Sequence, residues 1–275
     1  FDKSDQEVFE VIKKDKIDIL IDLSGHTQGN RLIVFAKKPA PIQITWLGYP
    51  NTTGLSSIDY RFTDKITDPI EKTEKFYTEK LYRLPNCFLC FKGNEEAQVI
   101  KEIPLISRKF VTFGSFNNFA KITHKTIKIW CTILNSIPNS HLILKTSKNN
   151  LMFNHYIKLF ANEGIDKGRV HIKNRVSNYQ DHLELYNQID IALDTFPYNG
   201  TTTTFEALWM GVPVITEKGD RHASSVGASI LTNLGLQNFI AKDLNEYIDL
   251  AKKFTGNPDY LQKLRLGLRE KLKKS

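Results

Sequence analysis

The sequence predicts an α/β protein with two Rossmann-like, doubly wound domains, of which the N-terminal one is incomplete. Short apolar runs alternate with longer stretches of helical period, as in parallel sheets flanked by helices. The 275 residues exceed the ~100–200 residues of one ordinary domain. The polar stretch Lys92–Glu102 interrupts the alternation and is the best candidate for a linker. We therefore expect a first domain over residues 1–95 and a second over residues 103–275.

The first domain shows only a short series of elements. Too few strands precede Lys92 to close a doubly wound sheet, which is why we interpret this domain as incomplete. In order, we expect a helix at Glu7–Lys14, a buried strand at Ile17–Leu23, a short helix at Leu32–Lys37, a strand at Ile42–Leu47 and an apolar segment at Lys80–Phe91.

The second domain shows the full alternation of strand and helix. The strands are expected at Phe110–Phe113, His141–Lys145, Val170–Ile172, Ile189–Leu193 and Val212–Thr216. The helices are expected at His124–Ile137, Asn150–Asn162, Asn178–Asn187, Thr202–Met210, Ala223–Leu234, Leu244–Phe254 and Asp259–Lys273.

The overall charge limits the partner classes. Lys and Arg number 38 against 30 Asp and Glu, giving +8, which would suit nucleic acid, an acidic membrane or a phosphate-bearing ligand. The excess is spread thinly, and its densest cluster, Lys263–Lys274, falls on an amphipathic helix whose charged face is expected to be solvated. No apolar run approaches the ~20 residues of a membrane span. We expect a cytoplasmic protein with neither a membrane nor nucleic acid as partner.

The cysteines do not predict a metal site. Cys87 and Cys90 form a C-x-x-C, but a four-ligand zinc site needs a second pair, and their apolar neighbours favour core packing in a strand. A D-x-D pattern is also absent from the sequence, which argues against a metal-dependent sugar transferase. We expect no metal and no bound cofactor.

One strand end stands out as a candidate binding site. The strand Ile189–Leu193 is followed by Asp194–Gly200 and then by four threonines that open a helix, Thr201–Thr204. A helix N-terminus offers free N–H groups and partial positive charge to a phosphate. The alternative is that one threonine caps the helix and the others are incidental. Glu206, about one turn in, could bind ribose hydroxyls or be a solvated carboxylate.

Other strand ends carry weaker candidates, because ligands of open α/β sheets bind at the carboxyl ends of strands. Lys121 follows Gly114–Ala120 and could neutralise a diphosphate, although a lysine there could equally lie at the surface. Ser177 and Gln180 have capping-box spacing and place His182 in the first turns of a helix, as a ligand contact or an exposed bystander. His26 faces a cleft or closes a turn.

Several longer motifs resemble one family over nearly the whole chain and in the same order. They are Pro39–Gln43, Trp46–Gly54, Phe113–Asn118 with Lys121, Leu193–Thr204 and Glu206–Pro213. These runs resemble the catalytic region of the O-GlcNAc transferase and SPINDLY family. The resemblance implies a two-domain glycosyltransferase of the GT-B fold that uses no metal and transfers a sugar with inversion onto Ser or Thr hydroxyls of proteins.

The resemblance also implies roles for individual residues. Lys121 matches the lysine on the donor diphosphate and Asn118 a nearby amide contact. Thr201, Thr202 and Thr203 match the phosphate-binding helix start, and Glu206 matches the acidic residue on the ribose. His182 matches a histidine near the nucleotide base, and we count it with Lys121 as catalytic. Leu47 and Gly48 match the loop that borders the sugar.

The chain departs from the family pattern in two respects, and one alternative donor and two rival functions stand beside our first hypothesis. The histidine-bearing strand and the tetratricopeptide repeats that usually come earlier in this family do not occur in the chain, and Ser225 stands where many relatives carry arginine, with Arg221 as a possible replacement. Our first hypothesis is transfer of GlcNAc from UDP-GlcNAc, with GDP-fucose as the alternative donor. The rivals are a nucleotide-sugar-binding module without catalysis and, least favoured, a nucleic-acid binder.

Overall fold

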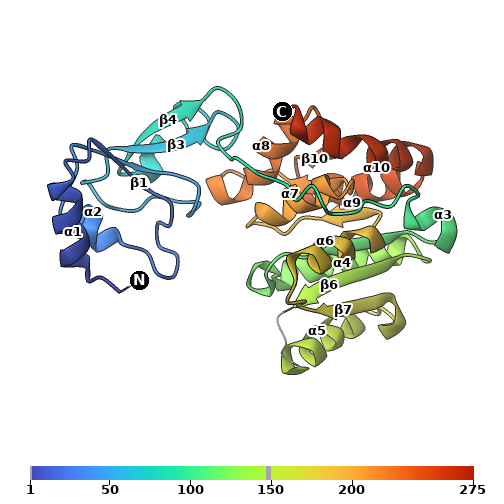
Figure 1. The fold of residues 1–275 in the computed structure, drawn as a ribbon. Coiled ribbons are helices and arrows are strands. Elements are labelled where there is room, and N and C mark those ends of the chain that lie inside the picture. The colour runs from blue at the N-terminus through green and yellow to red at the C-terminus, as the bar shows by residue number, and fades with distance from the viewer. Residues whose placement is uncertain (1, 147–149) are drawn as a thin grey trace. The chain divides into compact units, whose positions relative to one another are not determined.

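The computed structural model describes residues 2–146 and 150–275, and the chain divides into two compact units (Figure 1). Unit 1 comprises residues 1–90 together with Arg221–Ser225, and unit 2 comprises Phe91–Asp220 and Val226–Ser275. The stretch predicted as a linker belongs to unit 2, because the indole N–H of Trp209 donates to the Asn94 carbonyl and Arg269 donates to the Ala97 carbonyl. The sequence analysis placed Arg221–Ser225 in the second domain, whereas the structure places this segment in unit 1.

Unit 1 is built on a four-stranded parallel sheet in the order β1-β2-β3-β4. Its helix α2 buries Leu32 and Phe35 against Ile58, which forms a small apolar core. Helix α1 begins with a capping box from Ser4 and Glu7. The elements are α1 (Asp5–Lys14), β1 (Ile19–Asp22), α2 (Leu32–Ala36), β2 (Ile42–Thr45), β3 (Tyr60–Asp64), a 3-10 turn η1 (Glu74–Phe76) and β4 (Lys80–Leu84).

Three expectations for this unit need correction. The strand β3 was not predicted, because Arg61, Thr63 and Asp64 gave it no apolar pattern, although all three side chains are buried. The strand β1 was predicted to be buried, yet Ile19 and Ile21 are 52% and 42% exposed at this edge of the sheet. Cys87 and Cys90 lie beyond the end of β4 rather than in a strand, and Cys90 is exposed.

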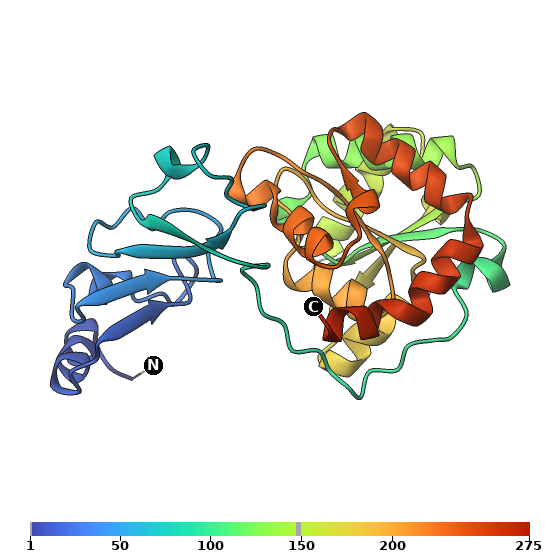
Figure 2. The same cartoon turned by 90° about the horizontal axis from the view of Figure 1, so that it is seen from above.

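Unit 2 is a six-stranded parallel sheet in the order β10-β9-β8-β5-β6-β7 with helices on both faces (Figures 1 and 2). The order reverses between β5 and β8, which makes this the topological switch point of a Rossmann-like sheet. The strands are β5 (Thr112–Ser115), β6 (His141–Thr146), β7 (Val170–Asn174), β8 (Ile191–Leu193), β9 (Val214–Glu217) and β10 (Ile240–Ala241). The helices are α3 (Pro104–Arg108), α4 (His124–Ser136), α5 (Asn150–Asn162), α6 (Tyr179–Glu184), α7 (Thr202–Trp209), α8 (Val226–Asn233), α9 (Leu244–Thr255) and α10 (Pro258–Lys273).

The apolar side chains between sheet and helices explain why these segments fold as predicted. Phe113 on β5 and Trp130 on α4 are fully buried, as is Leu208 on α7. Helix α4 starts with a capping box between Thr123 and Thr126. The elements α3 and β10 were not predicted, since five and two residues are too few to show a period. Helix α6 is capped by Asn178, not by Ser177 as the spacing suggested.

Within the described ranges, no helix combines the length and the apolar character that crossing a membrane requires.

Candidate functional site

A cavity of about 690 Å³ opens at the carboxyl ends of the strands of unit 2. Its walls come from the segment that follows β5, from the ends of β6 and β7, and from the first turns of α6 and α7. These elements meet at the switch point between β5 and β8, where doubly wound sheets bind their ligands. The lining includes five residues named by the sequence analysis: Asn118, His182, Thr202, Thr203 and Glu206.

Asp194, directly after β8, fixes the loop that leads to this cavity. Its carboxylate accepts hydrogen bonds from the Gly200 N–H at 2.6 Å, the Thr195 N–H at 2.9 Å and the Thr216 hydroxyl at 2.7 Å. Burial raises the pKa of Asp194 to about 6, although these donors and the charge of Lys121 oppose the rise. The loop therefore has a defined shape before any ligand binds.

The threonine run begins helix α7 at the wall of the cavity. Thr201 is the N-cap residue, but its side chain makes no capping hydrogen bond, and its carbonyl accepts the N–H groups of Thr204 and Phe205. The Thr203 hydroxyl donates to the Asn117 side chain at 2.7 Å, which ties the helix start to the end of β5. The first N–H groups of α7, at Thr202 and Thr203, remain available at the helix end that carries partial positive charge.

A chain of polar side chains crosses the wall between α6 and α7. The His182 Nε2 lies 2.8 Å from a carboxylate oxygen of Glu206, which also accepts the Tyr186 hydroxyl at 3.3 Å. The other ring nitrogen of His182, Nδ1, contacts the Lys145 ammonium. An ammonium can only donate and a carboxylate can only accept, so beside the charged form of Lys145 the Nδ1 atom is the acceptor and Nε2 carries the proton that is donated to Glu206.

Burial and Arg175 lower the pKa of Lys145 to about 8, and the nearby Glu206 carboxylate opposes part of this shift. Its ammonium also lies 5.5 Å from the centre of the Phe116 ring. The cavity therefore has one wall with a lysine whose charge changes near neutral pH.

Lys121 and Thr201 do not line the cavity. The Lys121 ammonium donates to the Asn199 carbonyl at 2.7 Å and lies 3.8 Å from the centre of the Tyr198 ring. Burial lowers its pKa, with Asp194 opposing. Lys121 thus contacts the loop that leads into α7, two residues before Thr201, rather than the open space of the cavity.

Leu47 and Gly48, predicted to border the sugar, belong to unit 1 and follow its strand β2. Leu47 has φ of 64°, in the left-handed region that side chains with a Cβ rarely adopt. A Cβ on Gly48 would lie 2.0 Å from the Leu23 carbonyl oxygen, so only glycine fits there. The His26 Nε2 lies 2.8 Å from the Thr53 carbonyl oxygen, so His26 connects its own loop to the loop after β2 rather than closing a local turn.

The sequence analysis missed Lys145, Asn117 and Tyr186 as members of the site. Lys145 occupies the next-to-last position of β6, and Asn117 precedes the predicted Asn118, so both follow the rule that ligands bind at strand ends. Tyr186 gave no such signal, because it lies in the 3-10 turn after α6 and reaches Glu206 only through tertiary packing. Among residues 2–146 and 150–275, there is no cluster of three or more His, Cys, Asp or Glu side chains that could hold a metal ion.

Comparison with known proteins gives one family. Residues 3–105 and 103–275 match the model of glycosyl transferase family 41. A rice protein (Oryza sativa subsp. japonica) named probable UDP-N-acetylglucosamine–peptide N-acetylglucosaminyltransferase SPINDLY is 45% identical over 98% of this chain. The similarly named SEC protein of Arabidopsis thaliana is 34% identical over 97% of it. The chain spans only 29% and 28% of these two relatives.

Among solved structures, a mutant O-GlcNAc transferase of Thermobaculum terrenum superposes with a TM-score of 0.93 and 34% identity. The match covers 99% of this chain and 52% of that one. A structure of TarM from S. aureus with UDP bound has a TM-score of 0.52 at 12% identity and supports the fold alone. The fold is GT-B, as the sequence analysis predicted.

Proposed function

Because the chain belongs to glycosyl transferase family 41, we propose that it carries the donor site of an inverting protein O-glycosyltransferase. The proposed reaction moves GlcNAc from UDP-GlcNAc to Ser or Thr hydroxyls of proteins, without a metal or bound cofactor. The names of the relatives support the class of donor and acceptor. The two partners proposed for the whole protein are thus a nucleotide sugar and a protein acceptor.

The observation that carries this proposal is the start of α7 in the wall of the cavity. The N–H groups of Thr202 and Thr203 are held there because Asp194 accepts the N–H of Gly200 just before the helix and because the Thr203 hydroxyl donates to Asn117. Fixed donors at a helix N-terminus suit a diphosphate, which gains negative charge as the sugar departs. Donors that are already in place stabilise that developing charge without reorganisation during the reaction.

We assign the nucleoside to the part of the cavity that Glu206 and His182 line. Glu206 would accept hydrogen bonds from the ribose hydroxyls through the oxygen lone pairs that His182 and Tyr186 leave open. His182 and the amide of Asn118 would contact the nucleotide near its base and diphosphate, respectively.

Lys121 is the proposed counter-charge of the leaving diphosphate. Its ammonium rests on the Asn199 carbonyl in the free protein, next to the loop that Asp194 organises. A diphosphate oxygen is a stronger acceptor than this neutral carbonyl, so we expect the ammonium to transfer to the nucleotide. The negative charge on the diphosphate is larger in the transition state than in the bound donor, so Lys121 should contribute more to turnover than to binding.

The test uses the full-length protein with UDP-GlcNAc and a peptide library that contains serine and threonine. We expect Lys121→Ala to lower kcat about 100-fold, in the range known for loss of one transition-state donor, and to weaken UDP binding much less. Lys125→Ala is the matched control, because Lys125 is an exposed lysine in the first turn of α4. Calorimetry supplies the affinity for UDP and labelled-sugar transfer supplies kcat.

Each other result favours a defined alternative. Transfer from GDP-fucose but not from UDP-GlcNAc would replace the donor and keep the reaction class. Binding of UDP without any transfer would favour a nucleotide-sugar-binding module. Equal kcat for Lys121→Ala and Lys125→Ala would remove Lys121 from the proposed mechanism.

A further inference from the structure

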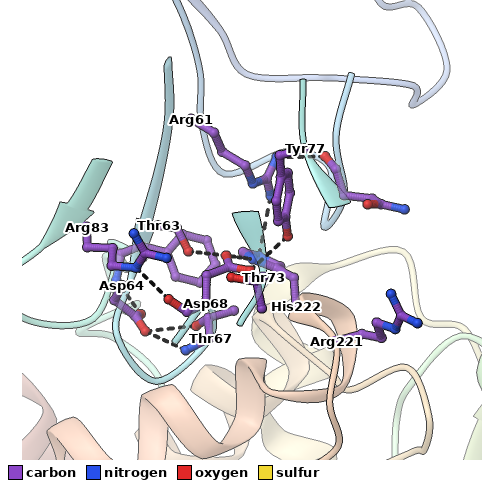
Figure 3. A network of polar contacts seen from close by, with 12 residues as sticks. Arg61, Thr63, Asp64, Thr67, Asp68, Thr73, Tyr77, Arg83, Arg221 and His222 are labelled. Carbon is purple, nitrogen blue, oxygen red and sulfur yellow. Dashed lines mark hydrogen bonds and ion pairs between the residues drawn. The ribbon is translucent and has the colours of Figure 1, made fainter. Parts of the chain in front are cut away.

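Unit 1 contains a buried network of polar side chains that the proposed donor site does not use (Figure 3). At its centre are Asp68, in the turn after β3, and His222, in the segment Arg221–Ser225. Asp68 is completely buried and His222 is 4% exposed. Two ionisable side chains without contact to water need partners for every polar atom, which makes their arrangement informative.

The carboxylate of Asp68 accepts hydrogen bonds from three side chains. His222 Nδ1 lies 2.7 Å from it, the Tyr77 hydroxyl donates at 2.9 Å, and the Thr63 hydroxyl donates to the same oxygen as His222 (Figure 3). Burial opposes the ionised form, but these hydrogen bonds and the contact with His222 hold the pKa of Asp68 below its ordinary value. Asp68 is therefore a carboxylate that accepts from His222.

On its other side the imidazole meets Arg61, whose guanidinium nitrogen lies 3.4 Å from His222 Nε2. A carboxylate only accepts and a guanidinium only donates, so both neighbours require the same neutral ring, protonated on Nδ1. Burial and the charge of Arg61 lower the pKa of His222, with Asp68 opposing. The neutral imidazole thus bridges a buried anion and a buried cation.

Arg61 connects His222 to the loop after β2. Its two terminal nitrogens donate to the Asn51 carbonyl and to the Tyr49 carbonyl, both at 2.7 Å. Arg61 is 1% exposed, and its guanidinium carbon lies 5.5 Å from the Tyr77 ring centre. Since both carbonyls belong to the loop Leu47–Thr53, the position of Arg61 determines the path of that loop.

The same loop is held at its far end by Glu79. This carboxylate accepts the Thr53 N–H at 2.7 Å and the Thr52 hydroxyl at 2.7 Å. The loop leaves the carboxyl end of a parallel strand and begins with Leu47 in the left-handed region. Strained residues at strand ends persist where surrounding contacts enforce them, and they occur often at functional sites.

We propose that His222 is a positioning residue of the transfer reaction. With Asp68 it fixes Arg61, and Arg61 fixes the Tyr49 and Asn51 carbonyls, so that the loop Leu47–Thr53 has one shape when the sugar is present. This inference rests on the proposed function for the transfer reaction, and on the family resemblance for the assignment of Leu47 and Gly48 to the sugar. The segment that supplies His222 joins β9 to α8 of unit 2 along the chain, so one βα connection contributes the side chain that shapes a loop of unit 1.

The test compares three variants of the full-length protein. His222→Leu keeps an apolar side chain against Phe88, whose ring centre lies 4.9 Å from that of His222, but removes both polar contacts. His222→Gln can still donate to Asp68 and accept from Arg61. Arg83→Met is the matched structural control, because Arg83 donates to the Asp68 and Pro69 carbonyls and to Glu74 but to no atom of the loop.

Two readouts separate positioning from general stability. Hydrogen exchange of the amides of the loop Leu47–Thr53, in which Pro50 has no amide hydrogen, should accelerate in His222→Leu, return toward wild type in His222→Gln and stay unchanged in Arg83→Met. With UDP-GlcNAc and the peptide library, kcat of His222→Leu should fall at least about tenfold, because displacement of a positioning group by 1 Å can cost ~100-fold. The dissociation constant of UDP should change less than about twofold, as its proposed contacts lie in unit 2.

The outcomes that overturn the inference differ from those that overturn the function. Unchanged exchange in the loop Leu47–Thr53 of His222→Leu would disprove the link from His222 to the loop, whether or not the protein transfers sugar. The same loss of kcat in Arg83→Met would reduce His222 to a structural role. A wild-type protein without transfer activity would refute the proposed function, while the exchange experiment would still decide the link.

Discussion

Lys145 gives a quantitative prediction for nucleotide binding. Its pKa of about 8 means that about half of the Lys145 side chains are neutral at pH 8, roughly one-tenth at pH 7 and about nine-tenths at pH 9. A diphosphate bound in the same cavity adds negative charge near the Lys145 ammonium, which favours its charged form. If binding returns the pKa to its ordinary value, UDP should bind with uptake of about 0.5 proton at pH 8 and about 0.9 proton at pH 9.

The coupling between protonation of Lys145 and binding also makes the affinity for UDP depend on pH. Since the charged form falls from about nine-tenths to about one-tenth between pH 7 and pH 9, UDP should bind about tenfold more weakly at pH 9, or ~1.4 kcal/mol. The pH range matters because the last ionisation of a phosphate ester lies near 6, so UDP itself releases no proton above pH 8. Lys145 is only partly buried, so tenfold is an upper value.

Isothermal titration calorimetry at pH 8 in buffers of different ionisation enthalpy measures the proton uptake directly. Lys145→Met should abolish most of it. Lys173→Met is the control, because Lys173 is the register partner of Lys145 on β7 but does not line the cavity. A heat of binding that is independent of the buffer in the wild-type protein would refute the reasoning, and so would an uptake that survives in Lys145→Met.

Two further predictions concern stability. Because burial lowers the pKa of His222, this histidine takes up a proton at a higher pH in the unfolded chain than in the folded one. The free energy of unfolding should therefore fall as the pH drops below about 6.5, and His222→Gln should lack this pH-dependent loss. The raised pKa values of Asp190 and Asp194 have the opposite effect, because they increase the free energy of unfolding as the pH falls from about 6 to 4. The test is therefore the difference in the free energy of unfolding between wild type and His222→Gln, measured by urea denaturation at pH 5 and at pH 7.5. Gly48→Ala should lower the free energy of unfolding by about 2 kcal/mol, because the new Cβ would overlap the Leu23 carbonyl. Gly267→Ala on α10 should raise it by about 0.5–1 kcal/mol, because nothing lies within 4 Å of the new Cβ. Equal effects of the two changes in urea denaturation would contradict the packing argument.

The sequence by itself determined most of unit 2. Its alternation of apolar strands and helical stretches predicted β5 to β9 and the longer helices, because hydrophobic period is a local property of the chain. The threonine run predicted the start of α7 for the same reason, since a helix N-terminus and its free N–H groups depend on adjacent residues. In unit 1 the hydrophobic pattern was weaker, and it did not predict β3 because buried side chains of that strand are polar.

Only the tertiary structure decided which polar groups meet. Strand order brings Lys145 to His182 and places Lys121 on the Asn199 carbonyl instead of in the cavity, and neither contact has a local signature. The bond between Asp68 and His222 joins residues 154 positions apart and moves Arg221–Ser225 into unit 1. A buried polar side chain is stable only with its partner, and the chain finds that partner through packing of distant segments, which no periodicity encodes.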